Sequence, residues 1–359
     1  WRRRLDTADP LKGLTRDDVG LLSPRLAGEA DVPEVPGTTL DETWKAATRD
    51  TGEKEGADPF YLRFLGDSVM EADVDLLRPE SIPADLSTVF EQTWLSLPSE
   101  SNYALHRILA TLAILREYGT DELMQAVVNA SLPAEQALRL PELSALRAKA
   151  GKLLVYDGDC YGLFHDRFRW FLVGRPSTRL DMALCRYEEM DATGRFGPRQ
   201  VAKLHSALAD MAVQWNDSAS PELVRGYVLQ YGPHHQVMAG RVQDAVRTLT
   251  DYSVINERLK SNQSGAWVKD METVWQAESS CAVVENPKTL QLWESYAREL
   301  SHILERGDEY WPSNKIMLQL AAEHGDNSAV TKAAEAWLDD GNCDWLWLKN
   351  LHRPKKVAP

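Results

Sequence analysis

Apolar residues recur at every third or fourth position along most of this chain, and the spacing changes once, near its middle. A three-to-four spacing places apolar side chains on one face of an α-helix, whereas a half-buried strand alternates at every second position. Residues 152–156 are β-like, Asp157-Gly158 is a hairpin turn signal, and residues 160–164 are β-like again. The sequence therefore predicts a mainly α protein that contains one short β-hairpin.

Several helices are predicted before the hairpin. A wide apolar stripe begins at Pro59, and a second helix follows Ile82-Pro83 and stops at Pro98, because proline cannot continue a helix. The helix opened by Ser101 is apolar over more than half of its circumference, so we expect it to be buried centrally. Helices followed by a short hairpin are the outline of a winged helix. Three more helices are expected, at residues 39–48, 121–129 and 133–150.

The chain after Gly174 is predicted to be helical to its end. Helical pairs joined by short turns fit an α-solenoid or a superhelical bundle, although no exact repeat period is found. Trp337, Trp345 and Trp347 are expected to pack together and close the core at this end. The predicted helices of this part cover residues 199–215, 221–231, 240–251, 270–277, 288–307, 313–323 and 329–339.

The composition bounds the class of protein. With 359 residues the chain is long enough for two or three domains, and 43% of its residues are apolar, as in folded proteins. No apolar run reaches the roughly 18 residues of a membrane span. A net charge of −14 disfavours nucleic-acid binding, because an acidic surface repels a polyanion. The four cysteines are scattered and lack metal-site spacing, so we expect reduced thiols in the cytoplasm.

Common catalytic motifs are absent from the sequence. There is no Gly-x-x-x-x-Gly-Lys phosphate loop, Gly-x-Gly-x-x-Gly turn, His-Glu-x-x-His pair or Gly-x-Ser-x-Gly elbow. The segment from Asp157 begins like a calcium loop, but its twelfth position is Phe168, which cannot chelate a cation. We therefore predict that this chain is not an enzyme by itself and that it binds no metal.

Two pairs of residues are candidates for chemical sites. His234-His235 has no acid or cysteine nearby at metal-ligand spacing, so we expect two polar residues at a helix start. Cys160 and His165 flank one predicted strand, but no third group is available to orient a nucleophile pair. Neither pair supports a catalytic or metal-binding role.

The most informative segment is Phe164-His165-Asp166, where the predicted hairpin runs into an amphipathic helix. A helix N-terminus is a natural docking point for phosphate, because its free N–H groups and dipole favour an anion. The residues alone leave two interpretations open. His165 contacts a phosphate, or it is an ordinary strand-end histidine beside Asp166 as an acidic N-cap. Pro59 alone is interpreted as a proline in the first turn of a helix.

The order of these segments resembles the C-terminal half of the STAND signalling ATPases, which include the apoptosome scaffold, plant resistance proteins and bacterial NACHT-like receptors. Ala57-Asp58-Pro59-Phe60-Tyr61-Leu62 resembles the Gly-x-Pro motif that opens the helical domain, with Ala57 in place of glycine. Phe164-His165-Asp166 resembles the Met-His-Asp motif of the winged helix, with Phe164 in place of methionine. Residues 227–241 are similar to the helical repeat of bacterial members, and residues 345–354 resemble the exit segment before a WD-repeat propeller.

The resemblance implies a nucleotide-controlled switch. Pro59 would pack beside the adenine, and His165, next to Asp166, would hydrogen-bond the β-phosphate of ADP in the closed state. Exchange for ATP would release this contact, free the winged helix and expose a surface for self-oligomerisation. An imidazole suits the task, because it donates a hydrogen bond without a fixed charge. ADP or ATP would be bound only together with an upstream nucleotide-binding core, since this chain lacks the phosphate loop.

The resemblance also implies the organisation of the chain and its partners. The first residue, Trp1, and the basic exit at 353–356 lead us to expect a piece of a longer polypeptide. The expected partners are an upstream core and effector domain, a downstream WD-repeat sensor and other copies of the chain, in a cytoplasmic defence or signalling receptor without nucleic acid or membrane. The predicted parts are 1–28 as the tail of the ATPase core, 29–98 as helical domain, 99–174 as winged helix, 175–345 as superhelical domain and 346–359 as linker.

Two alternatives remain open from the sequence. The first is a transcription regulator whose winged helix binds DNA, which the acidic charge disfavours. The second is a plain α-solenoid scaffold for protein interactions, without any link to a nucleotide. A phosphate loop upstream of Trp1 would favour the switch, and its absence would favour the scaffold.

Overall fold

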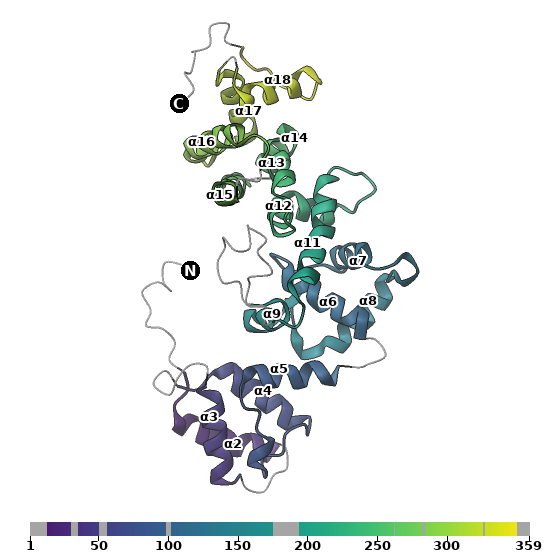
Figure 1. Cartoon of the computed structure of the whole chain (residues 1–359), viewed down its shortest axis with the longest axis vertical. Helices are drawn as coiled ribbons and strands as arrows, with labels where there is room; N and C mark the ends of the chain where they lie inside the picture. Colours follow the sequence, from purple (N-terminus) through teal and green to yellow (C-terminus); the bar gives the residue numbers. More distant parts are fainter. Residues whose placement is uncertain are drawn as a thin grey trace. The chain divides into compact units, whose positions relative to one another are not determined.

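The computed structural model describes residues 13–29, 35–49, 56–97, 102–174, 194–261, 263–281, 284–325 and 327–349. The described part is mainly helical (Figure 1), with one antiparallel two-stranded sheet. This confirms the predicted combination of many helices with one short hairpin. Pro98, Ser101 and the basic segment at 353–356 lie outside the described residues. The chain divides into two compact units, Trp1–Ser99 and Glu100–Pro359, and its finer division into five parts stays a prediction.

The first unit packs its helices around an aromatic core. Helix α2 contacts α3 and α4, and α4 contacts α5. Phe64 and Phe90 are buried and meet edge to face with ring centroids 5.6 Å apart, and buried Tyr61 donates to the Pro83 carbonyl at 2.6 Å. The elements are α2 (Arg16–Glu29), α3 (Gly37–Ala47), α4 (Pro59–Met70), η1 (Pro79–Ser81) and α5 (Leu86–Ser96).

The second unit begins with helices arranged around α6 (Asn102–Ile114). Helix α6 contacts α7, α8, α9 and β2, and its residues Leu105, Ile108 and Leu109 are completely buried. The predicted central burial of this helix is therefore confirmed. The elements that follow it are α7 (Asp121–Ala130), η3 (Ala134–Gln136), α8 (Leu140–Ala150), η4 (Gly151–Leu153), β1 (Leu154–Asp157), β2 (Cys160–Leu163) and α9 (Asp166–Val173).

The hairpin has the predicted turn. Asp157 pairs with Cys160 at the last position of the ladder, so Gly158 and Asp159 form a two-residue turn. Gly158 has a φ of 60°, which glycine adopts without a steric penalty. A third segment joins this sheet, because Gly119, between α6 and α7, exchanges two backbone hydrogen bonds of 2.9 Å with Tyr161 of β2.

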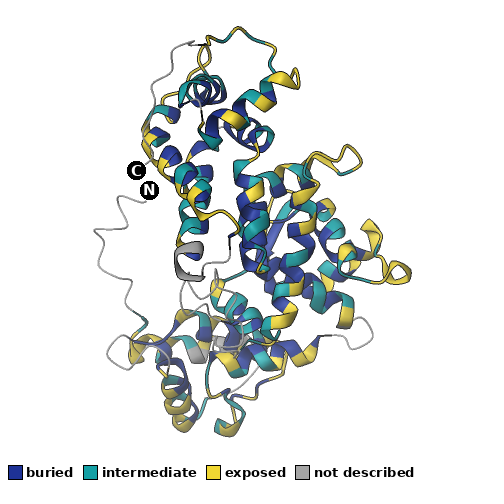
Figure 2. Ribbon diagram, turned by 45° about the horizontal axis from the view of Figure 1, so that its top comes forward, coloured by how far each residue is buried: buried dark blue, intermediate teal, exposed yellow. Residues whose placement is uncertain are grey.

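The rest of the second unit is a series of helices in which neighbours along the chain pack together. One hydrophobic cluster runs from Val237 to Trp337 and includes Trp267 and Trp293. Figure 2 shows buried positions along one face of the helices and exposed positions along the other. The helices are α11 (Pro198–Val213), α12 (Glu222–Met238), α13 (Val242–Thr250), α14 (Tyr252–Lys260), α15 (Ser264–Cys281), α16 (Pro287–Leu304), α17 (Ser313–Glu323) and α18 (Ala329–Asp339).

The predicted packing of the tryptophans at the end of this series is confirmed for Trp337 and Trp345. Trp337 is buried against Tyr252 and Trp345, with ring centroids 5.3 and 6.0 Å away. Lys315 places its ammonium group 5.7 Å from the centre of the half-buried Trp345 ring. Trp347 is half-buried and lies outside the main cluster.

The helix predicted at 133–150 is wrong in one respect, because the chain leaves the helical conformation in its middle. Asn129 binds the backbone of Leu138 on both sides, accepting from its N–H at 2.8 Å and donating to its carbonyl at 2.9 Å. Pro141 then stands in the first turn of α8, where its missing N–H costs nothing, whereas a helix continuous from 133 to 150 would lose the bond of this N–H to the Ala137 carbonyl. The segment therefore forms η3 and α8 instead of one helix.

The helix predicted at 221–231 is too short. Helix α12 continues through Gly232 and Pro233 to Met238. Gly232 lies against α11, where a Cβ atom would be only 2.5 Å from the Cβ of Ala212. The close packing of α11 on α12 therefore outweighs the local tendency of Gly-Pro to end a helix. Helix α14 lies between the individually predicted helices 240–251 and 270–277, in a stretch that was predicted to be helical without bounds of its own.

Candidate functional site

His165 lies at the start of α9, and it is His165, not Asp166, that caps this helix. His165 is the N-cap of α9, and its Nδ1 atom accepts from the backbone N–H of Arg167 at 3.0 Å. Asp166 was considered as the N-cap, and this is wrong, because it is the first residue inside the helix. Asp166 is exposed and lies 3.7 Å from the guanidinium of Arg169, one helical turn away.

The segment around His165 is fixed to the hairpin. The backbone N–H of Phe164 donates to the Leu153 carbonyl at 3.1 Å, which continues the pairing of the two strands. The Phe164 ring packs on Phe168 of α9, with centroids 5.5 Å apart. His165 is half-buried at this junction. The histidine thus lies where the hairpin joins α9, next to a residue that contacts both elements.

Pro59 occupies the first turn of α4, as predicted. Asp58 caps this helix by accepting from the backbone N–H of Phe60 at 2.9 Å, and Pro59 itself is exposed. Ala57 is buried and pairs with Leu14 through two backbone hydrogen bonds. Pro59 belongs to the first unit, whereas His165 and Asp166 belong to the second. A nucleotide site that includes all three therefore stays a prediction.

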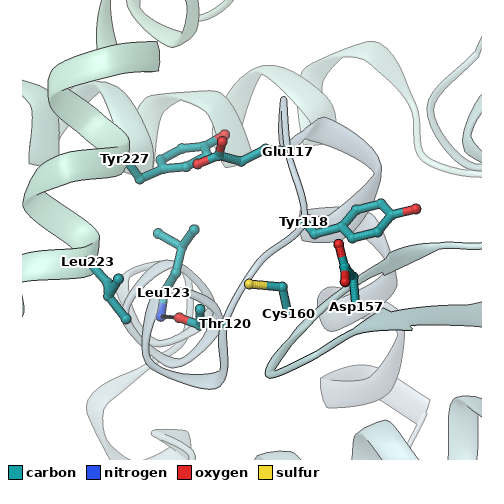
Figure 3. A pocket seen from close by; sticks show the side chains of 8 residues that line it. All are labelled: Glu117, Tyr118, Thr120, Leu123, Asp157, Cys160, Leu223 and Tyr227. Carbon is teal, nitrogen blue, oxygen red and sulfur yellow. Dashed lines mark hydrogen bonds between the residues drawn. The ribbon is translucent and has the colours of Figure 1, made fainter. Parts of the chain in front are cut away.

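The second unit contains a pocket of about 410 Å³ that sequence reasoning did not find (Figure 3). It lies where the α6–α7 connection, the start of α7, the end of the hairpin and the start of α12 meet. Its volume falls within the roughly 300–1,000 Å³ of small-molecule sites. The residues that line it are Glu117, Tyr118, Thr120, Leu123, Asp157, Cys160, Leu223 and Tyr227.

The charged groups that line the pocket are both acidic. The Glu117 carboxylate accepts from the Tyr231 hydroxyl at 3.1 Å. The Asp157 carboxylate has no hydrogen bond or ion pair with another described residue. None of the eight lining residues is basic. The pocket therefore presents two carboxylates to an incoming ligand without a cation among its own side chains.

One wall of the pocket depends on a glycine. Tyr118 lies against β2 at Gly162, where an added Cβ atom would be 2.5 Å from Cδ1 of the tyrosine ring. Any other residue at Gly162 would displace this ring. Thr120 caps α7 by accepting from the backbone N–H of Leu123 at 3.3 Å. Hairpin and helix cap thus hold two sides of the pocket in place.

The floor of the pocket continues into a buried hydrogen-bonded chain. The Tyr227 oxygen accepts from the backbone N–H of Arg116 at 3.1 Å and lies 2.9 Å from Nε2 of His235. Nδ1 of His235 lies 2.7 Å from Nδ1 of His205 on α11. No other acceptor for the phenolic hydrogen is found among the described residues. Tyr227 therefore donates to His235, and Nδ1–H of His235 donates to His205.

Burial keeps these imidazoles neutral. It lowers the pKa of His205 and of His235 well below the usual value of 6.5, and neighbouring His234 adds to the effect in both cases. The pKa of Tyr227 is raised, again mainly by burial. A chain of neutral donors and acceptors in a low-dielectric interior is stable as long as each member keeps its partner.

The position expected for His234-His235 is wrong. Both residues lie inside the last turns of α12 and not at a helix start, because the helix runs on past Pro233. His205 from α11 joins them, with ring centroids 6.1 Å from His234 and 5.0 Å from His235. Within the described ranges, no group of three or more His, Cys, Asp or Glu residues is arranged to hold a metal ion.

Sequence reasoning missed His205 and Glu117, because their roles depend on contacts across the chain. His205 lies between Leu204 and Leu208, and a histidine on an apolar helix face is the one signal of burial that the sequence offers. Glu117 meets Tyr231, which is 114 residues away. A contact between residues so far apart in the sequence cannot be predicted from a local sequence pattern.

The chain was compared with protein-family models, with curated proteins and with solved structures, and none of the three comparisons gives a match. None of the helices in the part of the chain that the structure describes combines the length and apolar character of a membrane span.

Proposed function

We propose that this chain is the regulatory region of a STAND-type signalling ATPase, which couples the ADP or ATP state of an upstream core to opening and oligomerisation. One observation carries the proposal. His165 is half-buried at the N-terminus of α9, directly after the hairpin, in the order that the resemblance implies. The chain would act in the cytoplasm as a switch and not as an enzyme.

The arrangement of the elements around His165 supports a winged helix. Helix α6, the bridging residue Gly119, helices α7 and α8, and the hairpin follow one another in the chain, and Gly119 pairs with β2. In a winged helix, a small sheet packs against the helices. Here the hairpin and the Gly119 segment form such a sheet, and α6 contacts its strand β2. The helices α11 to α18 would form the superhelical arm that follows it.

The residues present fit one contact to a phosphate and no more. A helix N-terminus and an imidazole favour an anion, but the chain has no phosphate loop to surround a nucleotide. His165 would therefore hold the β-phosphate of ADP that an upstream core binds, with Asp166 beside it and Pro59 against the adenine. Because Phe164 ties α9 to the hairpin, loss of this contact would release both together.

DNA binding receives less support. Arg147 of α8 is a basic side chain near the hairpin, but it is paired with Asp121 at 2.8 Å and lies over the Tyr161 ring at 4.8 Å. A guanidinium held in this way is not available for a DNA phosphate without losing both contacts. The net charge of −14 opposes DNA binding as well.

The test uses the complete natural polypeptide that contains this chain and compares two substitutions of one residue. His165→Ala removes both the imidazole and the helix cap, which is worth about 1 kcal/mol. His165→Asn keeps an acceptor for the Arg167 N–H but removes the imidazole. We expect both variants to lose bound ADP faster than the parent protein and to form oligomers without a trigger, as measured by nucleotide content and light scattering.

The asparagine variant separates the switch from simple stability. Unchanged ADP retention in His165→Asn, together with faster loss in His165→Ala, would mean that only the cap matters, and the switch proposal would fail. The absence of a phosphate loop in the coding sequence upstream of Trp1 would also overturn it. A plain helical scaffold would then remain.

A further inference from the structure

The pocket of Figure 3 combines two features that together select one class of ligand. Its charged lining groups are the carboxylates of Glu117 and Asp157. Its rim is partly apolar, because Tyr118 and Leu223 keep 44% and 56% of their surface exposed. Carboxylates bind cations, and exposed aromatic and aliphatic surface binds a hydrocarbon stem.

Tyr118 makes this pocket better suited to a cation than carboxylates alone would be. The face of an aromatic ring attracts a guanidinium or ammonium group within about 6 Å of its centre. The ring of Tyr118 packs on Gly162, and Tyr118 and Asp157 both line the pocket (Figure 3). An incoming cation would therefore meet a carboxylate and an aromatic face that are already in position, which lowers the entropy cost of binding.

A competing positive charge belongs to Arg116, the residue before Glu117. Its side chain is not part of the pocket lining, but its charge lowers the pKa of His234 and of His235 and opposes the rise in the pKa of Tyr227 and of Tyr231. The hydrogen bond from Tyr231 holds one oxygen of Glu117 in place. The two carboxylates of the lining outnumber this one guanidinium, so the pocket keeps a net negative charge for a ligand.

We propose that this pocket binds a guanidinium or primary ammonium group carried on a short apolar stem. Asp157 and Glu117 pair with the cation, Tyr118 covers it, and Leu123 and Leu223 contact the stem. Such a group belongs to a free diamine or guanidine and also to an arginine side chain of a peptide. This site is independent of the proposed nucleotide switch, since it uses none of the residues assigned to that switch.

The buried chain behind the pocket gives the site its own reporter. Tyr227 lines the pocket and hydrogen-bonds His235, which hydrogen-bonds His205. A cation placed against the floor changes the polarity around Tyr227, so the nuclear magnetic resonance signals of both imidazoles should shift on binding. Ligands that bind elsewhere on the acidic surface would leave these two buried rings unchanged.

Calorimetric titration of the 359-residue chain with agmatine and with neutral butylurea tests the proposal. We expect agmatine to bind with one site per chain and to shift the ring signals of His205 and His235, and butylurea to do neither. Asp157→Asn should weaken agmatine binding about fivefold, in line with an exposed ion pair worth about 1 kcal/mol. Glu117→Gln, which keeps an acceptor for Tyr231, should weaken it by a similar factor.

Asp159→Asn is the matched control, because Asp159 is in the hairpin turn and is exposed but does not line the pocket. Equal weakening by Asp159→Asn and Asp157→Asn would reduce the effect to net charge and overturn the proposal. Binding of butylurea as tight as that of agmatine, or no binding of agmatine at all, would overturn it too. An acetylated and amidated Leu-Arg-Leu peptide that binds more tightly than agmatine would identify a peptide as the source of the cation.

Discussion

The buried histidine pair is the clearest case in which single residues determine a property of this protein. His205 and His235 are 3% and 0% exposed, and their Nδ1 atoms are 2.7 Å apart. One nitrogen must donate and the other accept, so a second proton on His205 would leave two N–H groups facing each other. A second proton on His235 would place an N–H on Nε2, against the hydroxyl hydrogen that Tyr227 donates to this atom. The folded protein therefore excludes protonation of this pair over a range in which free histidine titrates.

This exclusion predicts a loss of stability in mild acid. The pKa of each ring is below 6.5 in the folded state, whereas an unfolded histidine titrates near 6.5. Below pH 6.5 the unfolded chain therefore binds more protons than the folded one, and the free energy of unfolding falls as the pH falls. From pH 7.5 to 5.5 each histidine should contribute about 1.4 kcal/mol to this fall, which urea unfolding at the two pH values measures.

The contribution of one ring can be isolated with His205→Gln, in which the amide still offers an acceptor for Nδ1–H of His235. The variant has a lower stability at both pH values, but its fall between them should be smaller than that of the parent protein by about 1.4 kcal/mol. Carboxylates that titrate in this range act equally in both proteins and cancel. An identical fall in the two proteins would show that His205 already titrates normally in the folded state.

At the scale of the element, the close packing of α11 on α12 depends on one glycine. Alanine is favoured over glycine inside a helix by about 1 kcal/mol, so Gly232 of α12 is unfavourable by propensity alone. A Cβ atom at this position would lie 2.5 Å from the Cβ of Ala212 on α11. Both atoms are attached directly to backbone, so the clash can be relieved only by moving the helices apart. The packing of α11 on α12 therefore depends on this glycine.

We expect Gly232→Ala to destabilise the protein, because overpacking costs about 1–3 kcal/mol and exceeds the gain in helix propensity. Ala212→Gly removes the opposing methyl group and should restore much of the loss when the two substitutions are combined. Chemical unfolding of the parent, the two single variants and the double variant gives the coupling between the positions. Simple additivity of the two single effects would contradict the contact.

Helices α14 and α15 are joined by a different kind of contact, a buried ion pair. The Arg258 side chain is completely buried, and its Nη2 atom donates to Asp270 at 2.7 Å and to the Gln230 carbonyl at 3.3 Å. Burial raises the pKa of Asp270, and the nearby guanidinium opposes this shift. A buried pair of this kind adds little net stability, but the loss of one partner leaves an uncompensated charge. The pair therefore fixes how α14, α15 and α12 meet.

The elements that could be predicted from the sequence are those whose signals are local. The hairpin was predicted because Asp157-Gly158 and the flanking residues carry both the turn and the change in spacing. Proline in the first turn of α4 was predicted for the same reason. The end of α12 was misplaced, because Gly232-Pro233 is a local stop signal that contact with Ala212 overrides. The pocket was not predictable, since Glu117, Asp157 and Tyr227 come from segments that only tertiary packing brings together.

At the scale of the whole molecule, each of the two compact units has buried apolar residues of its own among the residues that the structure describes. The first unit is organised around Phe64 and Phe90. The second unit contains the cluster from Val237 to Trp337, in which Leu318 is completely buried. Compact units with their own buried residues usually unfold cooperatively. We therefore expect each unit to unfold with a free energy of its own.

Two core substitutions test this division. Phe64→Ala leaves a cavity in the first unit at a cost of about 3–5 kcal/mol, and Leu318→Ala leaves one in the second at a cost of about 2–5 kcal/mol. Differential scanning calorimetry of the whole chain should show two transitions, of which Phe64→Ala lowers one and Leu318→Ala lowers the other. Because each cavity lies inside one core, the transition of the other unit should stay within experimental error. A single transition that both substitutions lower would mean that the two units unfold together. The two units would then be separate in their contacts but not in their stability.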